Sequence, residues 1–339
     1  MSQVVQDGVR PLIDGFGRRI TYLRISVTDR CDLRCRYCMA EAMSFMPRDQ
    51  ILSLEEIAAI ADAFIARGVR KIRLTGGEPL IRKGVPELAG IIGRHIANGD
   101  LDELTLTTNG TNLARTAPAL VDAGVRRVNV SLDSRDPERF RHITRWGDVD
   151  KVLEGIAAAK AAGLRVKINM VALKGLNEDE IEPMLRWCAD EGHDLTLIET
   201  MPLGMIDEDR TDRYLPLDQV RDTLASRFTL TPLADRTGGP ARYHRVEELD
   251  TRIGLITPLT ENFCAGCNRV RITATGRLYM CLGHDDKVDL KTALRSGGPE
   301  ALDALLDQAM ALKPLRHDFR IDEREAAPAV VRHMSVTGG

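Results

Sequence analysis

The chain has 339 residues, of which 43% are hydrophobic and 29% are charged, and its formal net charge at pH 7 is -3. That length can bury a large core, and at roughly 150 residues per domain it suggests two domains. The slightly negative charge argues against a general nucleic-acid-binding protein, and no apolar run is long enough to predict a membrane-spanning helix. Charged residues also interrupt the stretch from Met1 to Arg24, so we expect no secretory signal and a cytoplasmic protein.

Strand-like runs alternate with helical patterns through residues 1–202, which is typical of βα units that build a parallel sheet. The six strands that we expect cover residues 22–28, 69–75, 101–108, 125–133, 165–173 and 195–201. A capping box, with Ser53 as N-cap and Glu56 three residues later, predicts the start of the first helix. Further helices are expected to begin near Val85, Leu113, Val149 and Glu178.

The predicted strands have one polar and one apolar face, because side chains two residues apart in a strand point the same way. The polar positions are Arg24, Ser26, Arg73, Thr75, Thr105, Thr107, Asn109, Asn129, Ser131, Asp133, Lys167, Asn169, Glu199 and Met201. The apolar positions, expected to pack outward on helices, are Ile25, Ile72, Leu74, Leu106, Val128, Val130, Ile168 and Ile198.

A polar inner face does not fit a closed eight-stranded barrel, whose interior is filled with branched apolar side chains. We therefore expect an α/β fold built on an incomplete, open βα barrel of about six parallel strands around a polar ligand. The alternative is a sheet whose polar face is simply exposed to solvent.

The pattern changes after Met201. Residues 203–227 are expected to form a linker or lid followed by a helix. Residues 228–339 are expected to form a C-terminal α+β region that closes the barrel mouth, with short strands at 254–258, 270–273 and 277–281 and helices near Leu290 and Leu302.

Six of the seven cysteines form two trios, which are Cys31, Cys35 and Cys38, and Cys264, Cys267 and Cys281. In a reducing compartment, closely spaced cysteines indicate metal ligands or redox centres. Each trio lacks the fourth ligand that closes a structural metal site. The first trio follows a predicted barrel strand, which favours an iron-sulfur cluster with one open iron over a zinc knuckle. The second stays ambiguous, because His284 could complete a Cys3His zinc site, and Cys188 is expected to be a buried small hydrophobe.

The spacing of the first trio, with Tyr37 before the last cysteine, resembles the radical S-adenosylmethionine (SAM) superfamily. Within it the chain resembles the molybdenum cofactor biosynthesis protein A family, the GTP 3′,8-cyclases, over nearly its whole length. That resemblance rests on the second trio and on residues 23–31, 76–79, 166–169, 198–202, 268–271 and the terminal Gly338-Gly339. Ala40 departs from the family, which commonly has Pro there.

The resemblance implies two 4Fe-4S clusters, one on each trio, with SAM on the open iron of the first and guanine facing the second. The SAM contacts that it implies are Tyr37, Gly77, Glu78, Ser131 and Met201. The GTP contacts that it implies are Arg24, Arg73, Thr107, Lys167, Arg269, Val270 and Arg271. The resemblance also implies that the tail, Gly338 and Gly339, reaches into the active site.

The implied reaction converts GTP to (8S)-3′,8-cyclo-7,8-dihydroguanosine 5′-triphosphate, in the first step of molybdenum cofactor biosynthesis. A 5′-deoxyadenosyl radical would take hydrogen from the ribose 3′ position, and the ribose carbon would then attack guanine carbon 8. Expected partners are a reduced electron donor such as flavodoxin and a cyclic pyranopterin monophosphate synthase that receives the product, with the chain a monomer or homodimer. Two rival hypotheses are a radical SAM peptide-maturation enzyme with an auxiliary cluster and a non-catalytic zinc or redox protein.

Overall fold

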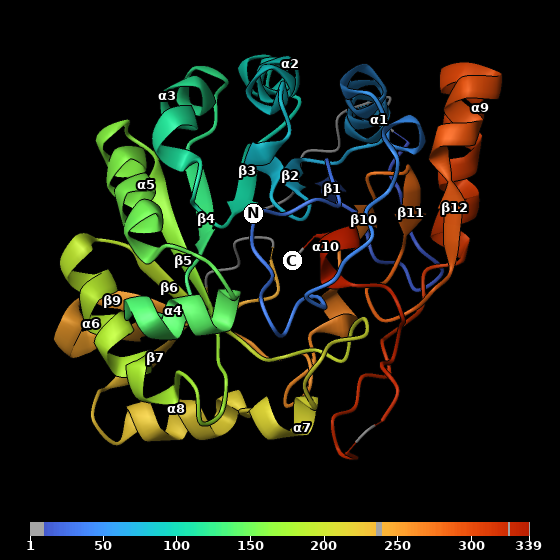
Figure 1. The fold of residues 1–339 in the computed structure, drawn as a ribbon. Coiled ribbons are helices and arrows are strands. Elements are labelled where there is room, and N and C mark those ends of the chain that lie inside the picture. Colours follow the sequence, from blue (N-terminus) through green and yellow to red (C-terminus); the bar gives the residue numbers. More distant parts are fainter. Residues whose placement is uncertain (1–9, 235–238, 325, 339) are drawn as a thin grey trace.

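The computed structural model describes residues 10–234, 239–324 and 326–338, which form one curved sheet of twelve strands with most of the helices outside it (Figure 1). The strand order is β12-β11-β10-β1-β2-β3-β4-β5-β6-β9-β8-β7. The six strands expected from the sequence are β1 (Tyr22–Ser26), β2 (Lys71–Thr75), β3 (Glu103–Thr108), β4 (Arg127–Ser131), β5 (Arg165–Val171) and β6 (Asp194–Ile198). Each pairs in parallel with the next. All six are shorter than predicted, because residues at one or both ends of each predicted run belong to the connecting loops.

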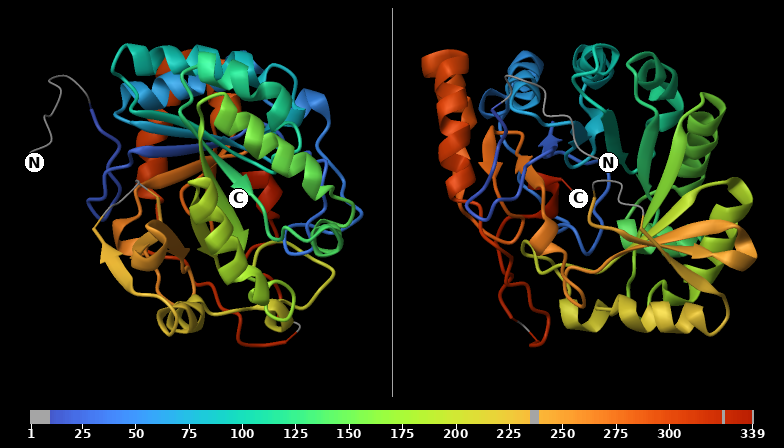
Figure 2. Two further views of the ribbon diagram at one scale, coloured as in Figure 1. Left: turned by 90° about the vertical axis from the view of Figure 1, so that its left-hand side faces the viewer. Right: turned by 180° about the vertical axis from the view of Figure 1, so that it is seen from behind.

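The C-terminal region adds strands to both edges of this half-barrel. β9 (Thr251–Ile256) lies parallel to β6, and β10 (Arg269–Ile272) lies parallel to β1. Antiparallel strands complete the edges, with β11 (Arg277–Tyr279) and β12 (Lys287–Asp289) on one side and β8 (Arg242–Val246) and β7 (Leu230–Leu233) on the other. The incomplete barrel is confirmed, and two parallel strands from the C-terminal region extend it. Because β7 and β12 do not meet, the barrel stays open (Figure 2).

Helices cover the outer face of the sheet (Figures 1 and 2). They include α1 (Leu54–Ala66), α2 (Val85–Ala97), α3 (Leu113–Asp122), α5 (Val149–Ala161) and α6 (Ile181–Glu191), near their predicted starts. The capping box is confirmed, because Ser53 Oγ accepts from Glu56 N at 3.1 Å and the Glu56 carboxylate accepts from Ser53 N at 2.7 Å. Short 3-10 turns lie at Arg48–Gln50, Pro79–Ile81, Glu178–Glu180, Glu247–Leu249 and Cys264–Gly266.

The remaining helices belong to the loops and the C-terminal region. They are α4 (Pro137–Thr144), α7 (Arg210–Arg213), α8 (Leu217–Ala225), α9 (Leu290–Ala311) and α10 (Met334–Thr337). The two helices predicted near Leu290 and Leu302 are both present within α9, where they meet at a kink. Gly298 at the kink has a non-helical backbone, with a φ of 63°, and Pro299 follows it. Across the described residues, no helix is both long enough and apolar enough to span a bilayer.

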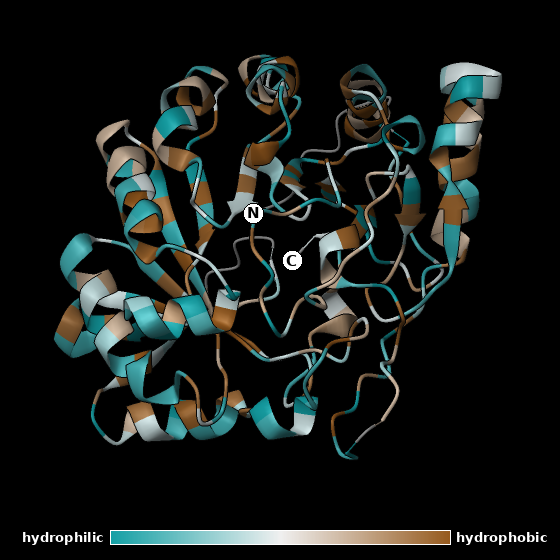
Figure 3. Cartoon of the chain, in the orientation of Figure 1, coloured by the Kyte–Doolittle hydropathy of each residue, from teal (hydrophilic) through white to brown (hydrophobic). Residues whose placement is uncertain are grey.

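The core lies between the outer face of the sheet and the helices. Hydrophobic and hydrophilic segments alternate along the strands in Figure 3, as two-faced strands require. Seven of the eight apolar strand residues predicted to face outward belong to this core, but Ile198 does not. Ile198 lines the inner cavity, and its neighbours Leu195 and Leu197 pack in the core instead.

The error at Ile198 came from extending the strand to Met201. β6 ends at Ile198, so the alternation does not continue into the loop, and a shift of one residue reverses the face of a strand. Glu199 has a structural role there. Its buried carboxylate accepts from the backbone N–H groups of Leu217 at 3.2 Å and Leu259 at 2.9 Å, and so fixes two loops.

Candidate active site

A cavity lies inside the half-barrel at the carboxyl ends of the central strands, and the first cysteine trio lines it. Four of the five predicted SAM contacts also line it, and so does one predicted GTP contact; they are Tyr37, Gly77, Ser131, Met201 and Thr107. Parallel strands present their carboxyl ends at one edge of a barrel, where active sites are found. The sheet therefore gathers residues from five separate strands and loops around the first trio.

The chemistry of the first trio fits a metal cluster. All three cysteines are free thiols, and burial, followed by the charges of Asp133 and the other two sulfurs, raises the pKa of Cys35 well above its ordinary value. Burial likewise raises the pKa of Cys38 to about 12. Three partly buried thiols that line one cavity resist losing protons unless a positive group binds them, which is what an iron-sulfur cluster does.

The second trio has a more positive environment. Burial raises the pKa of Cys267, but Arg269, Lys313 and Arg271 more than offset this and lower it to about 7. Lys313, only 3% exposed, has its Nζ 3.6 Å from Cys267 Sγ, and it donates to the carbonyls of Arg269 at 3.0 Å and Met280 at 2.7 Å. The lysine thus joins the two segments that carry this trio. Sequence reasoning missed it, because no motif marks it.

The alternative of a Cys3His zinc site at the second trio depends on His284. The Nε2 atom of His284 lies 3.0 Å from the carbonyl oxygen of Arg316, so this nitrogen has a hydrogen-bond partner outside the trio. Within the described residues, no three His, Cys, Asp or Glu side chains converge as the ligands of one metal ion would. In a cluster, by contrast, each thiolate binds a separate iron.

The Gly76-Gly77 turn packs against the loop that leads to the first trio. A Cβ atom on Gly77 would come within 2.2 Å of the Arg30 carbonyl oxygen, and one on Gly76 would come within 2.5 Å of the Thr28 carbonyl oxygen. We predicted that these glycines allow close approach to the methionine part of SAM. In the structure both glycines line the cavity, and their close approach to another loop also requires glycine; the contact with SAM stays a prediction.

Glu78 and Asp133 are buried carboxyl groups at this edge of the barrel. Glu78 is 1% exposed and accepts from Leu80 N, Thr108 Oγ1 and Asn109 N at 2.9, 2.8 and 2.6 Å, and burial raises its pKa to about 7. Asp133, whose pKa burial raises to about 6, accepts from Tyr37 Oη at 2.7 Å. Both carboxyl groups hold strand ends and loops in position, and Tyr37 is thereby fixed in the cavity wall.

A row of buried cations crosses the inner face of the sheet. Arg24 on β1 lies opposite Arg73 on β2 and Arg271 on β10 in the strand register. Burial lowers the pKa of Arg24, of Arg73 and, to about 10, of Arg271. It lowers the pKa of Lys167 on β5 to about 7. Removing a charged group from water costs free energy, so several buried cations on one face indicate a binding site for a polyanion that would pair with them.

Two further buried cations on this face were not predicted. Lys71 and Arg127 each lie close to Glu103, with Lys71 Nζ at 2.6 Å and Arg127 Nε at 3.1 Å from its oxygens. The Nε atoms of Arg73 and Arg271 have no hydrogen-bond partner among the described residues.

Arg269, two residues after Cys267, is also buried. Its side chain and Arg271 flank Val270, whose own side chain packs in the hydrophobic core on the other face of β10. Val270 could therefore meet a ligand only through its backbone. Cys267 and Arg269 border a second, larger cavity of about 970 Å³ beside Tyr243.

The C-terminal tail reaches the first trio. Met334 and Ser335 of α10 line the cavity there. Gly338 has a φ of 75°, and a Cβ on it would lie 1.8 Å from Thr75 Oγ1, so only glycine fits between the tail and β2. Gly339 lies outside the described residues.

Two family models match the chain, namely the Radical SAM superfamily over residues 25–188 and Molybdenum Cofactor Synthesis C over residues 193–319. The GTP 3′,8-cyclase of Rhodopseudomonas palustris is 61% identical over 331 residues, covering 97% of this chain and 96% of the relative. That of Rhizobium meliloti is 60% identical over 330 residues, covering 97% and 95%. That of Brucella canis is 58% identical over 339 residues, covering 100% and 98%.

Solved structures share the fold at low sequence identity. Streptococcus suis SuiB bound to S-adenosylmethionine has a TM-score of 0.59 and 15% identity, covering 85% of this chain and 68% of SuiB. Together with the two family models, the identity of about 60% over nearly the full length decides the assignment. The chain belongs to the GTP 3′,8-cyclase family of radical SAM enzymes.

Proposed function

We propose that this chain converts GTP to (8S)-3′,8-cyclo-7,8-dihydroguanosine 5′-triphosphate in molybdenum cofactor biosynthesis. One observation carries the proposal beyond family membership. The row of buried cations, Arg24, Arg73, Lys167 and Arg271, lies on the inner face of the same barrel that carries both cysteine trios. A nucleoside triphosphate carries the several negative charges that such a row can bind.

We assign each trio a 4Fe-4S cluster, with SAM at the first and the guanine of GTP at the second. SAM on a reduced cluster supplies the radical chemistry, which is hydrogen abstraction at ribose 3′ followed by bond formation at guanine carbon 8. Tyr37, Gly77, Glu78, Ser131 and Met201 are the proposed SAM contacts. Arg24, Arg73, Thr107, Lys167, Arg269, Val270 and Arg271 are the proposed GTP contacts, Val270 through its backbone.

The protein's own contribution is positioning and the exclusion of water. Guanidinium groups that are already buried and fixed lose little freedom when they bind a triphosphate, so the ribose can be held at one distance from the radical source. The tail ending in Gly338-Gly339 is proposed to cover the site beside Thr75. A closed site protects a reactive radical from side reactions.

The proposal extends to organisation and partners. Residues 1–202 would be the radical SAM unit, residues 203–227 a linker or lid, and residues 228–339 the unit that carries the second cluster. A reduced donor such as flavodoxin would supply electrons in the cytoplasm, and a cyclic pyranopterin monophosphate synthase would consume the product.

Replacing Cys281 by Ala tests the assignment of the second trio. The variant should keep the first cluster and still bind SAM, but form no cyclised nucleotide. Full cyclase activity in this variant would refute the role of the second trio. If the protein were instead a peptide-maturation enzyme, it would have no affinity for GTP. If it were a non-catalytic zinc protein, metal analysis would find zinc and no sulfide.

A further inference from the structure

The loop that carries the first trio is held from outside, because it has little regular structure of its own. Residues 31–39, here called the first-trio loop, form only one turn, in which Cys38 N and Met39 N donate to the Cys35 carbonyl at 2.9 and 3.1 Å. Its remaining backbone groups need partners elsewhere. Those partners decide which conformation the three thiols adopt.

The end of α4 supplies several of these partners. Arg34 N donates to the Thr144 carbonyl at 3.2 Å, and Arg36 N donates to the Ile143 carbonyl at 3.0 Å. The Arg36 side chain donates to the His142 carbonyl at 2.8 Å. The last carbonyls of a helix have no partner within the helix, so α4 offers them to the loop.

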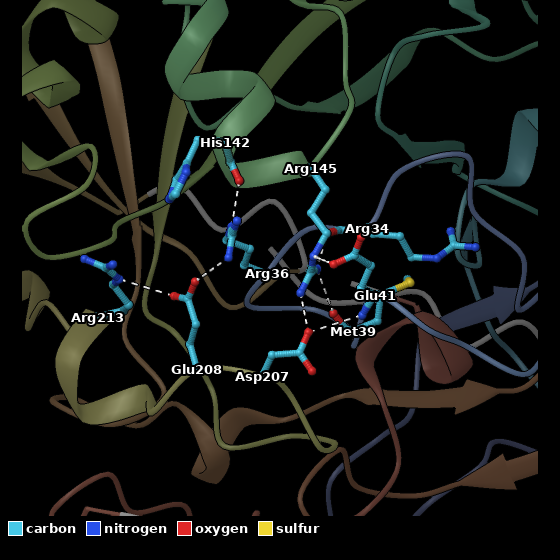
Figure 4. Close-up of polar contacts among 9 residues, drawn as sticks. All are labelled: Arg34, Arg36, Met39, Glu41, His142, Arg145, Asp207, Glu208 and Arg213. Atoms are coloured by element: carbon cyan, nitrogen blue, oxygen red, sulfur yellow. Dashed lines mark hydrogen bonds and ion pairs between the residues drawn. The ribbon is translucent and has the colours of Figure 1, made fainter.

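Arg145, the residue after α4, forms hydrogen bonds to the same loop through its side chain (Figure 4). Its Nη1 donates to the carbonyls of Arg34 at 2.6 Å and Met39 at 3.3 Å, which lie just outside Cys35 and Cys38. The side chain is 6% exposed. Its φ of 72° with ψ of -42° is unfavourable for a residue with a Cβ, and such a conformation persists only where the surroundings enforce it.

Acidic residues of the linker segment, residues 203–213, hold both arginines from the other side. Asp207 pairs with Arg145 and accepts from Glu41 N at 3.3 Å. Glu208 accepts from Arg36 Nη1 at 3.0 Å, as Figure 4 shows. The linker segment is itself tied to the chain before the tail, since Gly204 N donates to the Val330 carbonyl at 2.9 Å.

We propose that Arg145 is a positioning residue that fixes the first-trio loop with Cys35 and Cys38 directed into the cavity, and that Asp207 holds Arg145 in place. The role rests on the proposed function, since the loop is fixed in order to receive the first cluster. It gives a structural role to the strained backbone at Arg145 and to the acidic residues Asp207 and Glu208, none of which is among the proposed SAM or GTP contacts.

Hydrogen exchange of the cluster-free protein tests this without any enzymatic readout. In Arg145→Met, peptides covering residues 33–39 should exchange about tenfold faster or more than in the native protein, because two hydrogen bonds of a charged donor are lost. Arg145→Lys should exchange at an intermediate rate, since one ammonium cannot reproduce the guanidinium fork. Arg141→Met, an exposed arginine one turn earlier on α4, is the matched control and should exchange like the native protein.

A second measurement follows the cluster itself. In protein whose second trio is replaced by serine, the first cluster should lose iron to a chelator about tenfold faster in Arg145→Met, and Asp207→Asn should move in the same direction by less. Because the Asp207 side chain is half exposed, Asp207→Asn should fold, and it can replace Arg145→Met in the test if Arg145→Met does not fold. The proposal would be overturned if Arg145→Met exchanged hydrogen in residues 33–39 and lost iron at the same rates as the native protein. If only Asp207→Asn folds, the same result in that variant would overturn it. Neither readout involves GTP, so loss of the cyclase assignment would leave both results interpretable.

Discussion

Replacing Lys167 by Met should make the cluster-free protein more stable and weaken its binding of GTP. The pKa of Lys167 falls from 10.5 to about 7, first because of burial and then because of Arg73 and Arg127. At about 1.4 kcal/mol per pKa unit, this corresponds to roughly 4–5 kcal/mol of destabilisation while the lysine is charged. The ammonium also donates to the Tyr243 hydroxyl, a bond worth about 1 kcal/mol, so we expect a net gain of about 2–4 kcal/mol.

The pH dependence distinguishes a buried charge from a packing effect. A lysine whose pKa is lowered by folding binds fewer protons in the folded than in the unfolded state between pH 7 and 10.5. Native stability from this group therefore rises with pH across that window, and the full cost applies below pH 7. The advantage of Lys167→Met should accordingly be largest near pH 6.5 and shrink toward pH 10.

Anaerobic urea unfolding of the cluster-free protein measures the stability difference, with the exposed Lys83→Met as the control. Equilibrium binding of GTP to the reconstituted protein should show a loss of about 10–100-fold in Lys167→Met only. A variant that is less stable than the native protein at pH 6.5 and binds GTP normally would refute the reasoning.

Three further changes test separate parts of the structure. Lys313→Met should lower the iron content by weakening the second trio, since a buried cation beside Cys267 is lost; native iron and an unchanged electron paramagnetic resonance signal would contradict this. Gly77→Ala forces a Cβ to within 2.2 Å of the Arg30 carbonyl and should destabilise the first-trio loop, and a native melting temperature would show that the turn can move. Ser53→Ala removes the capping box of α1 and should cost about 1 kcal/mol in urea unfolding, whereas Ser226→Ala, at a helix end without such a box, should cost less.

The half-barrel was predictable because its evidence is local. Alternation of polar and apolar residues marks each strand, and the same alternation placed Arg24, Arg73 and Lys167 on the inner face. The failure at Ile198 shows the limit of that reasoning, since alternation gives the face only while the strand continues. Helix α4 was not predicted, although its start has a local signal in Asp136 as N-cap followed by Pro137.

Features that depend on pairing distant segments could not be predicted. β9 and β10 looked like parts of a separate region, and only strand pairing reveals that they extend the barrel at both edges. Lys313 contacts Cys267 from 46 residues away, with no spacing rule to connect them. Arg145 likewise meets Arg34 across 111 residues. The cysteine trios were recognisable because their spacing is itself the signal.

The central claim is that the two trios and the cations of the inner face form one site for cyclising GTP. Anaerobic reconstitution, followed by incubation with SAM, GTP and a strong reductant, by chromatographic separation of the nucleotides and by their mass analysis, tests it most directly. We predict 5′-deoxyadenosine together with a cyclised nucleotide of the same mass as GTP, and neither in Cys35→Ala. Cleavage of SAM in the presence of GTP without any cyclised nucleotide would contradict the claim.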